Sequence, residues 1–122
     1  MNVRNIILLL VVMVSVLVGG CDYNWIYEDI PVVNPDEPVS FAQDILPIFS
    51  AKNCIACHDG SPAPDLREAN AYTSISGGYI NTASPEESSI YTEPHPNGGH
   101  TVKYSAAQAA LVLAWIEQGA QE

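Results

Sequence analysis

Three prolines between residues 22 and 39 separate an apolar N-terminal stretch from the only part of the chain that can form a sizeable core. Pro31, Pro35 and Pro38 are interspersed with acidic residues, and prolines at this density disfavour both a helix and a central strand. We therefore expect residues 21–39 to be a linker. About eighty residues remain, 40–120. They suffice for one small domain, and domains of this size often need a metal, a cofactor or disulfides for stability.

The N-terminal stretch has the order of segments that is typical of an export signal. Arg4 precedes an apolar run of thirteen residues, Ile6–Val18, which is followed by two glycines and Cys21. Thirteen residues rise only ~20 Å as a helix, less than the ~30 Å hydrocarbon core of a bilayer. This order predicts a signal peptide over residues 1–20. An uncleaved anchoring helix is the alternative, and in both cases the domain lies outside the cytoplasm.

Residues 17–21, Leu-Val-Gly-Gly-Cys, resemble the lipobox of bacterial lipoproteins, in which cleavage precedes a cysteine that becomes lipid-modified. Val18 stands where that family most often has leucine. The resemblance implies that Cys21 is lipidated and that the protein is membrane-anchored and faces the periplasm or the cell surface. Acyl chains on Cys21 would contribute ~0.8 kcal/mol of membrane affinity per buried methylene.

The charge balance limits the kinds of partner. The chain has 14 Asp and Glu against 4 Lys and Arg, a net charge of −10. Nucleic acid is excluded as a partner, because so few cations cannot neutralise its phosphates. We expect partners with a basic surface instead, and an association that slows as the salt concentration rises.

From residue 40 onward the pattern predicts helices. Ser40 and Gln43 form a capping-box signature ahead of apolar residues at helical spacing, and Pro47 is expected to kink or shorten this helix. A second helix is predicted to open at Ser105 and to stop at Gly119, a residue suited to a C-terminal cap.

Two shorter helices are expected between these, over residues 67–75 and 85–91, the latter with Ser84 as its N-cap. No run of alternating polar and apolar residues is long enough to require a sheet. The sequence therefore predicts a mainly α domain of about three to five helices.

The residues that carry chemistry are concentrated in the motif Cys54-Ile55-Ala56-Cys57-His58. The pattern C-x-x-C-H is typical of covalent attachment of a c-type haem. Two thiols three residues apart on a helical turn can both reach the vinyl groups on one edge of a porphyrin, and the adjacent imidazole can bind the iron. Such attachment takes place outside the cytoplasm, in agreement with the predicted signal. With Cys21 assigned to lipidation, none of the 3 cysteines is left over.

Two other uses of these cysteines stay open. A Cys54–Cys57 disulfide of the thioredoxin kind would need a preceding strand in a βαβ unit, which the pattern does not predict. Cys54, Cys57, His95 and His100 also match the spacing of two-cysteine, two-histidine zinc ligands. That set leaves His58 without a role and requires an unusually long insert between the two pairs.

Residues from about 40 to 119 resemble a small monohaem cytochrome c domain of the class I type. The resemblance is carried by Phe41, Ile48-Phe49, the C-x-x-C-H motif, Pro64-x-Leu66 and Leu113-x-Trp115-Ile116 ahead of Gly119. It implies a compact helical fold around one covalent haem c, with Cys54 and Cys57 as attachment points and His58 as the proximal iron ligand. It also implies that the first and last helices cross beside the haem, pairing the face of Phe41 and Phe49 with Leu111 and Trp115. The carbonyl of Pro64 would then orient His58.

The resemblance leaves the sixth iron ligand open. Class I cytochromes usually supply a methionine from the loop before the last helix, whereas the only methionines here are Met1 and Met13, within the predicted signal. The corresponding loop, residues 91–104, contains His95 and His100. His100 lies about where the family's ligand falls, and His95 or an open, water-bound site are the alternatives. Histidine in place of methionine should lower the reduction potential.

The function we expect is electron transfer by a membrane-tethered, monohaem c-type cytochrome, without an enzymatic reaction. Its partners would be redox proteins with a basic docking patch, and the lipid anchor would keep the domain near those in the membrane. The alternatives are a five-coordinate haem domain that binds a small ligand or peroxide, and a zinc-stapled structural lipoprotein.

Overall fold

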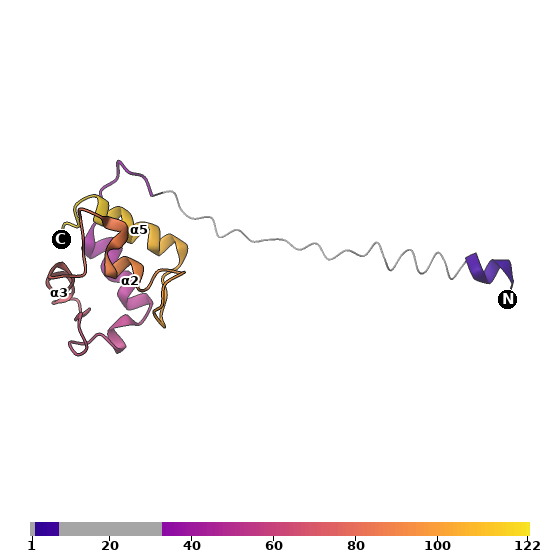
Figure 1. The fold of residues 1–122 in the computed structure, drawn as a ribbon, viewed down its shortest axis with the longest axis horizontal. Helices are drawn as coiled ribbons and strands as arrows, with labels where there is room; N and C mark the ends of the chain where they lie inside the picture. The colour runs from indigo at the N-terminus through magenta and orange to yellow at the C-terminus, as the bar shows by residue number, and fades with distance from the viewer. Residues whose placement is uncertain (1, 8–32) are drawn as a thin grey trace.

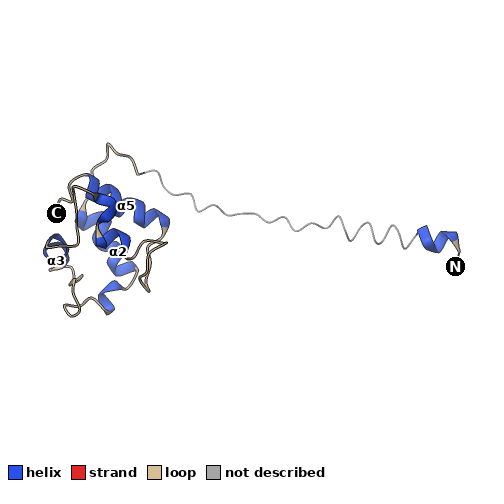
Figure 2. Cartoon of the chain, viewed as in Figure 1, coloured by secondary structure: helices blue, strands red, loops and turns tan. Residues whose placement is uncertain are grey.

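Helices joined by long loops make up the part of the chain that the computed structural model describes, residues 2–7 and 33–122 (Figures 1 and 2). Cys21, the lipobox and most of the predicted signal and linker lie outside these residues. Residues 3–7 are helical, and no helix within the two ranges has the length and apolar character needed to cross a membrane. These ranges contain no strand. The predicted class is confirmed to this extent: the chain forms a small all-helical domain of about five helices.

The first helical segment of the domain begins at Ser40, as predicted, but its cap differs in one contact. Ser40 Oγ accepts a hydrogen bond from Gln43 N at 3.3 Å, whereas Ser40 N donates to Asp44 Oδ2 at 2.8 Å rather than to the Gln43 side chain. The segment opens with a π-turn, η1 (Phe41–Ile45), and this wider turn brings Asp44 to the cap. Helix α2 (Leu46–Ala51) follows with Pro47 in its first turn, where a missing N–H is tolerated.

The two short helices predicted in the middle of the chain are both shorter than expected. The first becomes α3 (Ala71–Ser76), because the residues before it form a hydrogen-bonded turn around Asp65. The second is split into a 3-10 turn, η3 (Pro85–Glu87), and a short helix, α4 (Ser89–Thr92). Ser84 is the N-cap residue of η3 and Pro85 follows in its first turn, as predicted, but the Ser84 side chain makes no capping hydrogen bond. Between the two elements Ser88 is buried, and its Oγ accepts a hydrogen bond from Asn81 N at 2.9 Å.

Helix α5 (Ala106–Glu117) has both ends as predicted. Ser105 and Gln108 form a complete capping box, with Gln108 N donating to Ser105 Oγ at 3.2 Å and Ser105 N donating to Gln108 Oε1 at 2.9 Å. Gly119 follows the helix with a φ of 96°, a conformation that glycine adopts without strain. In Figure 1, α5 lies across the segment that contains α2, and the chain ends near α3.

The core is formed where η1 and α2 pack against α5. The ring centroid of Phe41 lies 5.4 Å from that of Trp115 and 6.4 Å from that of Phe49, so the predicted pairing of Phe41 with Trp115 is present. Aliphatic side chains complete this core: Ile45, Ile48, Leu66, Ile75, Ile90, Val112 and Ile116 are all buried. Burial of each such side chain stabilises the fold by about 1.5–3 kcal/mol relative to exposure.

The end of the predicted linker is attached to the C-terminal end of α5. Gln118 Nε2 donates a hydrogen bond to Glu37 O at 3.1 Å, and Gln118 Oε1 accepts one from Val39 N at 2.8 Å. Val39 also packs against the core. At the other boundary Ala120 is buried and its carbonyl accepts a hydrogen bond from the Tyr72 hydroxyl at 3.1 Å.

Candidate functional site

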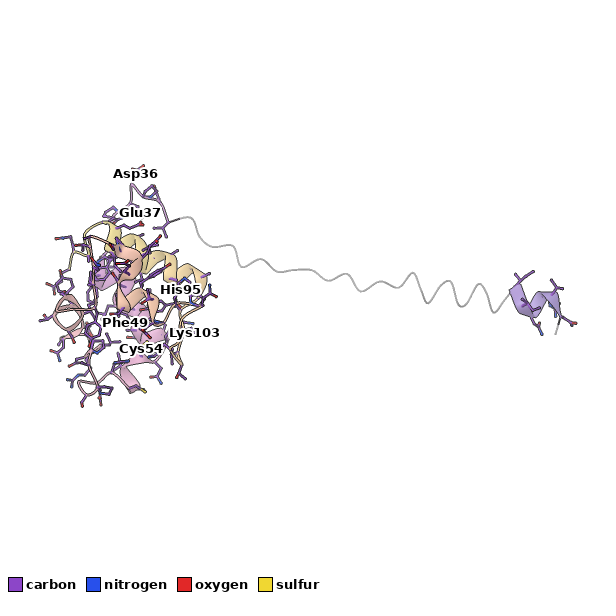
Figure 3. All side chains as sticks on the ribbon, in the orientation of Figure 1. Asp36, Glu37, Phe49, Cys54, His95 and Lys103 are labelled. Carbon is purple, nitrogen blue, oxygen red and sulfur yellow. The ribbon has the colours of Figure 1, made fainter. Side chains whose placement is uncertain are left out.

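A cavity of about 200 Å³ lies among α2, η2 (Cys54–Ala56), α4 and the two loops that follow η2 and α4. Four of its lining residues are of types that can bind metals or react with cofactors: Cys54, His58, Glu93 and His100. Most of the others are apolar or aromatic: Phe49, Ala63, Pro64, Leu66, Tyr79, Ile90, Pro94, Val102 and Tyr104. Figure 3 shows Phe49 and Cys54 at the end of the domain away from Asp36 and Glu37.

The C-x-x-C-H motif forms the tight turn η2 and the residues directly after it. Asn53 starts this turn with a φ of 55°, and the amides of Cys57 and His58 both donate to Cys54 O, at 3.1 and 3.0 Å. Both thiols are free, with Cys54 half-buried against the cavity and Cys57 exposed. Burial raises the pKa of the Cys54 thiol. The strand that a thioredoxin-like disulfide would require does not precede the motif within residues 33–53.

His58 is held by two contacts from the segment that follows the motif. Its Nδ1 lies 3.1 Å from Pro64 O, which is the contact expected from the resemblance to class I cytochromes. In addition, Leu66 N donates to His58 O at 2.8 Å. When Nδ1 carries the proton and donates to a carbonyl, Nε2 keeps the lone pair with which imidazole binds a metal.

His100 is held in a similar way from the loop between α4 and α5. Its Nδ1 lies 2.9 Å from Val102 O and 3.2 Å from Val102 N. One ring nitrogen cannot donate and accept at once, and the shorter contact favours an Nδ1 proton donated to Val102 O. This tautomer again leaves Nε2 with its lone pair. The backbone N of His100 donates to Glu93 O at 3.1 Å.

The two imidazoles face each other, with ring centroids 6.0 Å apart and planes 28° from parallel. An imidazole nitrogen binds a transition metal at about 2.0–2.1 Å and the ring centre lies about 1.1 Å further away, so two rings on opposite sides of one ion would have centroids roughly 6 Å apart. The centroid spacing of His58 and His100 matches this value, and the two rings are stacked.

His95, the alternative ligand, does not line the cavity. Its ring packs edge-on against Tyr91 at a centroid distance of 5.0 Å, and its Nδ1 accepts a hydrogen bond from Asn97 N at 3.2 Å. The four-residue zinc set that includes His95 is not assembled: within residues 2–7 and 33–122, no three His, Cys, Asp or Glu side chains gather to hold an ion.

The segment that supports His58 is itself fixed by Asp65, between Pro64 and Leu66. The Asp65 carboxylate accepts hydrogen bonds from Arg67 Nη2 at 2.6 Å and Asn70 Nδ2 at 2.8 Å, and Asp65 N donates to Ser74 Oγ at 2.8 Å. The hydrogen bond from the Arg67 guanidinium is the main cause that holds the pKa of Asp65 well below its usual range.

Tyr104 lines the cavity and lies at the end of the loop that carries His100. It is buried, its hydroxyl donates to Ile90 O at 3.1 Å, and its backbone N donates to Pro94 O at 2.7 Å. Burial raises the pKa of the phenol far above neutrality, so Tyr104 remains uncharged. The two hydrogen bonds thus connect the end of this loop to α4 and to the start of the loop.

Several of these contacts cannot be found by reading residue types. Leu66 N and Val102 O act through the backbone, and no residue type signals a backbone contact. The network around Asp65 does have a signal, because Asp65 and Arg67 are two residues apart in a turn-forming segment.

Comparisons of the chain with protein-family models, with curated proteins and with solved structures found no match. The function is therefore inferred from the residues and geometry of the cavity.

Proposed function

We propose that this chain is a c-type cytochrome domain that transfers electrons, with one haem bound covalently through Cys54 and Cys57. The observation that carries this proposal is the facing pair His58 and His100, 6.0 Å apart across an apolar cavity, beside a turn with two free thiols. Two attachment thiols, two axial imidazoles and apolar walls are the parts that such a haem requires. The resemblance of the sequence to class I cytochromes c supports the same assignment.

Each side chain at the cavity then has a defined role. His58 would be the proximal ligand and His100 the ligand on the opposite face, with Pro64 O and Val102 O fixing their orientation and strengthening them as ligands. A haem held there would supply reversible one-electron chemistry at its iron. Because two protein ligands would fill both axial positions, no position is left for a substrate, and this favours an electron carrier over an enzyme.

The apolar walls support electron transfer for a further reason. Phe49, Leu66 and Tyr104 are buried and line the cavity, so they would limit the access of water to a haem bound there. A dry, closely packed surrounding lowers the rearrangement that follows each change of charge and contributes to the reduction potential.

The partners proposed are redox proteins with a basic docking patch. The net charge of −10 supports this, and Arg67, one of the few cations, is engaged by Asp65. Attraction of this kind raises association rates and is screened by salt. Export and lipid anchoring at Cys21, as the lipobox-like segment predicts, would place the domain beside membrane-bound partners.

An absorption spectrum combined with a redox titration tests this function. The chain is produced with periplasmic haem attachment, and its spectrum is recorded in the oxidised and reduced states. A low-spin spectrum in both states, fully reversible on titration and without turnover of hydrogen peroxide, is expected. A variant with both Cys54→Ala and Cys57→Ala is the control and should carry no covalent haem. The absence of a Soret band from the parent chain would overturn the haem assignment, and a high-spin spectrum would favour the five-coordinate alternative.

A further inference from the structure

We propose that Gly98 keeps the sixth iron position closed, because only a residue without a Cβ lets the loop between α4 and α5 carry His100 to the cavity. One added methyl group at position 98 would then convert a closed electron carrier into a site that binds small external ligands. This inference rests on the proposed haem function.

One backbone hydrogen bond holds the loop against the C-terminal end of α4, and a second one closes a turn within the loop. His100 N donates to Glu93 O at 3.1 Å, and Gly98 N donates to His95 O at 2.7 Å. Glu93 is the C-cap residue of α4. The position of His100 is therefore set by how closely the loop approaches this helix end.

Gly98 lies at the point of closest approach. A Cβ built on Gly98 would overlap the carbonyl oxygens of Thr92 and Glu93 and would lie 3.0 Å from the carbonyl carbon of Glu93. All three are backbone atoms, so a side-chain rotation cannot relieve the overlap. The loop itself must move away from α4.

The same carbonyl links this overlap to the metal ligand. A Cβ at position 98 would overlap Glu93 O, and Glu93 O also accepts the hydrogen bond from His100 N. Displacement of the loop therefore acts first on the contact that places His100. His58 belongs to a different segment, held by Pro64 and Leu66, and should keep its position.

The neighbouring glycine provides a matched control. A Cβ built on Gly99 meets no atom within 4 Å. Neither Gly98 nor Gly99 has a φ in the left-handed region, so alanine suits the backbone at both. The two substitutions add the same methyl group to adjacent residues of one loop and differ in the space around it.

The test compares Gly98→Ala and Gly99→Ala with the parent chain, all with covalent haem attached, by absorption spectra and by carbon monoxide binding to the reduced form. Gly98→Ala is expected to lose the low-spin spectrum and to bind carbon monoxide at least about tenfold more tightly, because the open form is no longer a minor population. Added imidazole should restore its low-spin spectrum. Gly99→Ala should match the parent, and His100→Ala gives the spectrum of a fully open site.

Each remaining outcome counts against the inference. A Gly98→Ala variant that stays low-spin would show that the loop tolerates the methyl group. A Gly98→Ala variant that loses helical circular dichroism or covalent haem would show that Gly98 serves the whole fold rather than the placement of His100. If the parent chain carries no low-spin haem, the proposed function fails, and this result is distinct from a failure confined to Gly98.

Discussion

His58 and His100 both line the cavity and are fixed in the same manner, each through a backbone carbonyl at Nδ1. The distances are 3.1 Å to Pro64 O and 2.9 Å to Val102 O. Backbone carbonyls do not titrate in the accessible pH range, so the orientation of both rings depends on the local chain path rather than on a charged partner.

Replacing each loop histidine separately should identify the sixth ligand. His100→Ala is expected to change the haem from low-spin to high-spin, because it removes the imidazole that faces His58. His95→Ala is the matched control from the same loop and should remain low-spin, since His95 packs on Tyr91 away from the cavity. Absorption and electron paramagnetic resonance spectra distinguish the two spin states. The opposite pattern, with His95→Ala losing the low-spin signal, would refute the assignment.

Replacing His100 by methionine should raise the reduction potential. Thioether ligation favours the reduced iron more than imidazole does, so we expect a rise on the order of 100 mV, within the ~0.8 V range that axial ligands cover. Spectroelectrochemical titration of the parent chain and of His100→Met measures the difference. His95→Met introduces the same side chain off the cavity and should leave the potential unchanged. An equal shift in both variants would mean that His100 is not an iron ligand.

The Asp65 network should make stability depend on acid pH. Because the folded-state pKa of Asp65 is lowered, its contribution to stability is complete above the unfolded-state pKa of about 3.9 and is lost as the pH falls toward the folded value. Asp65→Asn is therefore expected to be less stable than the parent at pH 7, and the difference should shrink below about pH 4. Chemical denaturation at several pH values checks this. Glu68→Gln, an exposed carboxyl nearby, is the control, and a gap that persists unchanged at low pH would contradict the argument.

Truncation of Phe41 should test whether the contact between the first and last helices carries the fold. Phe41→Ala removes a buried ring that contacts Phe49, Tyr72 and Trp115, and such changes cost about 3–5 kcal/mol. Gln43→Ala, at an exposed position of the same segment, should change the free energy of unfolding by less than about 0.5 kcal/mol. Denaturant titration measures both. A loss below about 1 kcal/mol for Phe41→Ala would show that this contact is not central to the core.

The ends of α5 could be predicted from sequence because their determinants are local. Ser105 and Gln108 satisfy each other's backbone groups within four residues, and Gly119 needs only its own conformational freedom. The helix predicted over residues 85–91 is instead interrupted by a contact with a residue outside this segment. Ser88 is drawn into the interior by its hydrogen bond with Asn81, and this interrupts the helix between η3 and α4.

The sequence predicted one side of the candidate site, the C-x-x-C-H motif, more completely than the other side, the loop between α4 and α5. On one side, Cys54, Cys57 and His58 were singled out by residue type and spacing, and the structure places Cys54 and His58 at the cavity. On the other side the sequence favoured His100 from its position in the loop and left His95 or an open site as alternatives. What distinguishes His100 from His95 is the path of the loop, and that path depends on backbone contacts to Glu93 and on the space at Gly98.

The hydrogen bonds that join Glu37 and Val39 to Gln118 determine where a force applied to the preceding chain reaches the domain. A force transmitted along the chain from before Val33 reaches the domain at the C-terminal end of α5. Figure 3 shows Asp36 and Glu37 at one end of the domain and Cys54 toward the other, and none of the residues that line the cavity belongs to this junction. A force that enters at this junction therefore reaches the domain away from the cavity that His58 and His100 line.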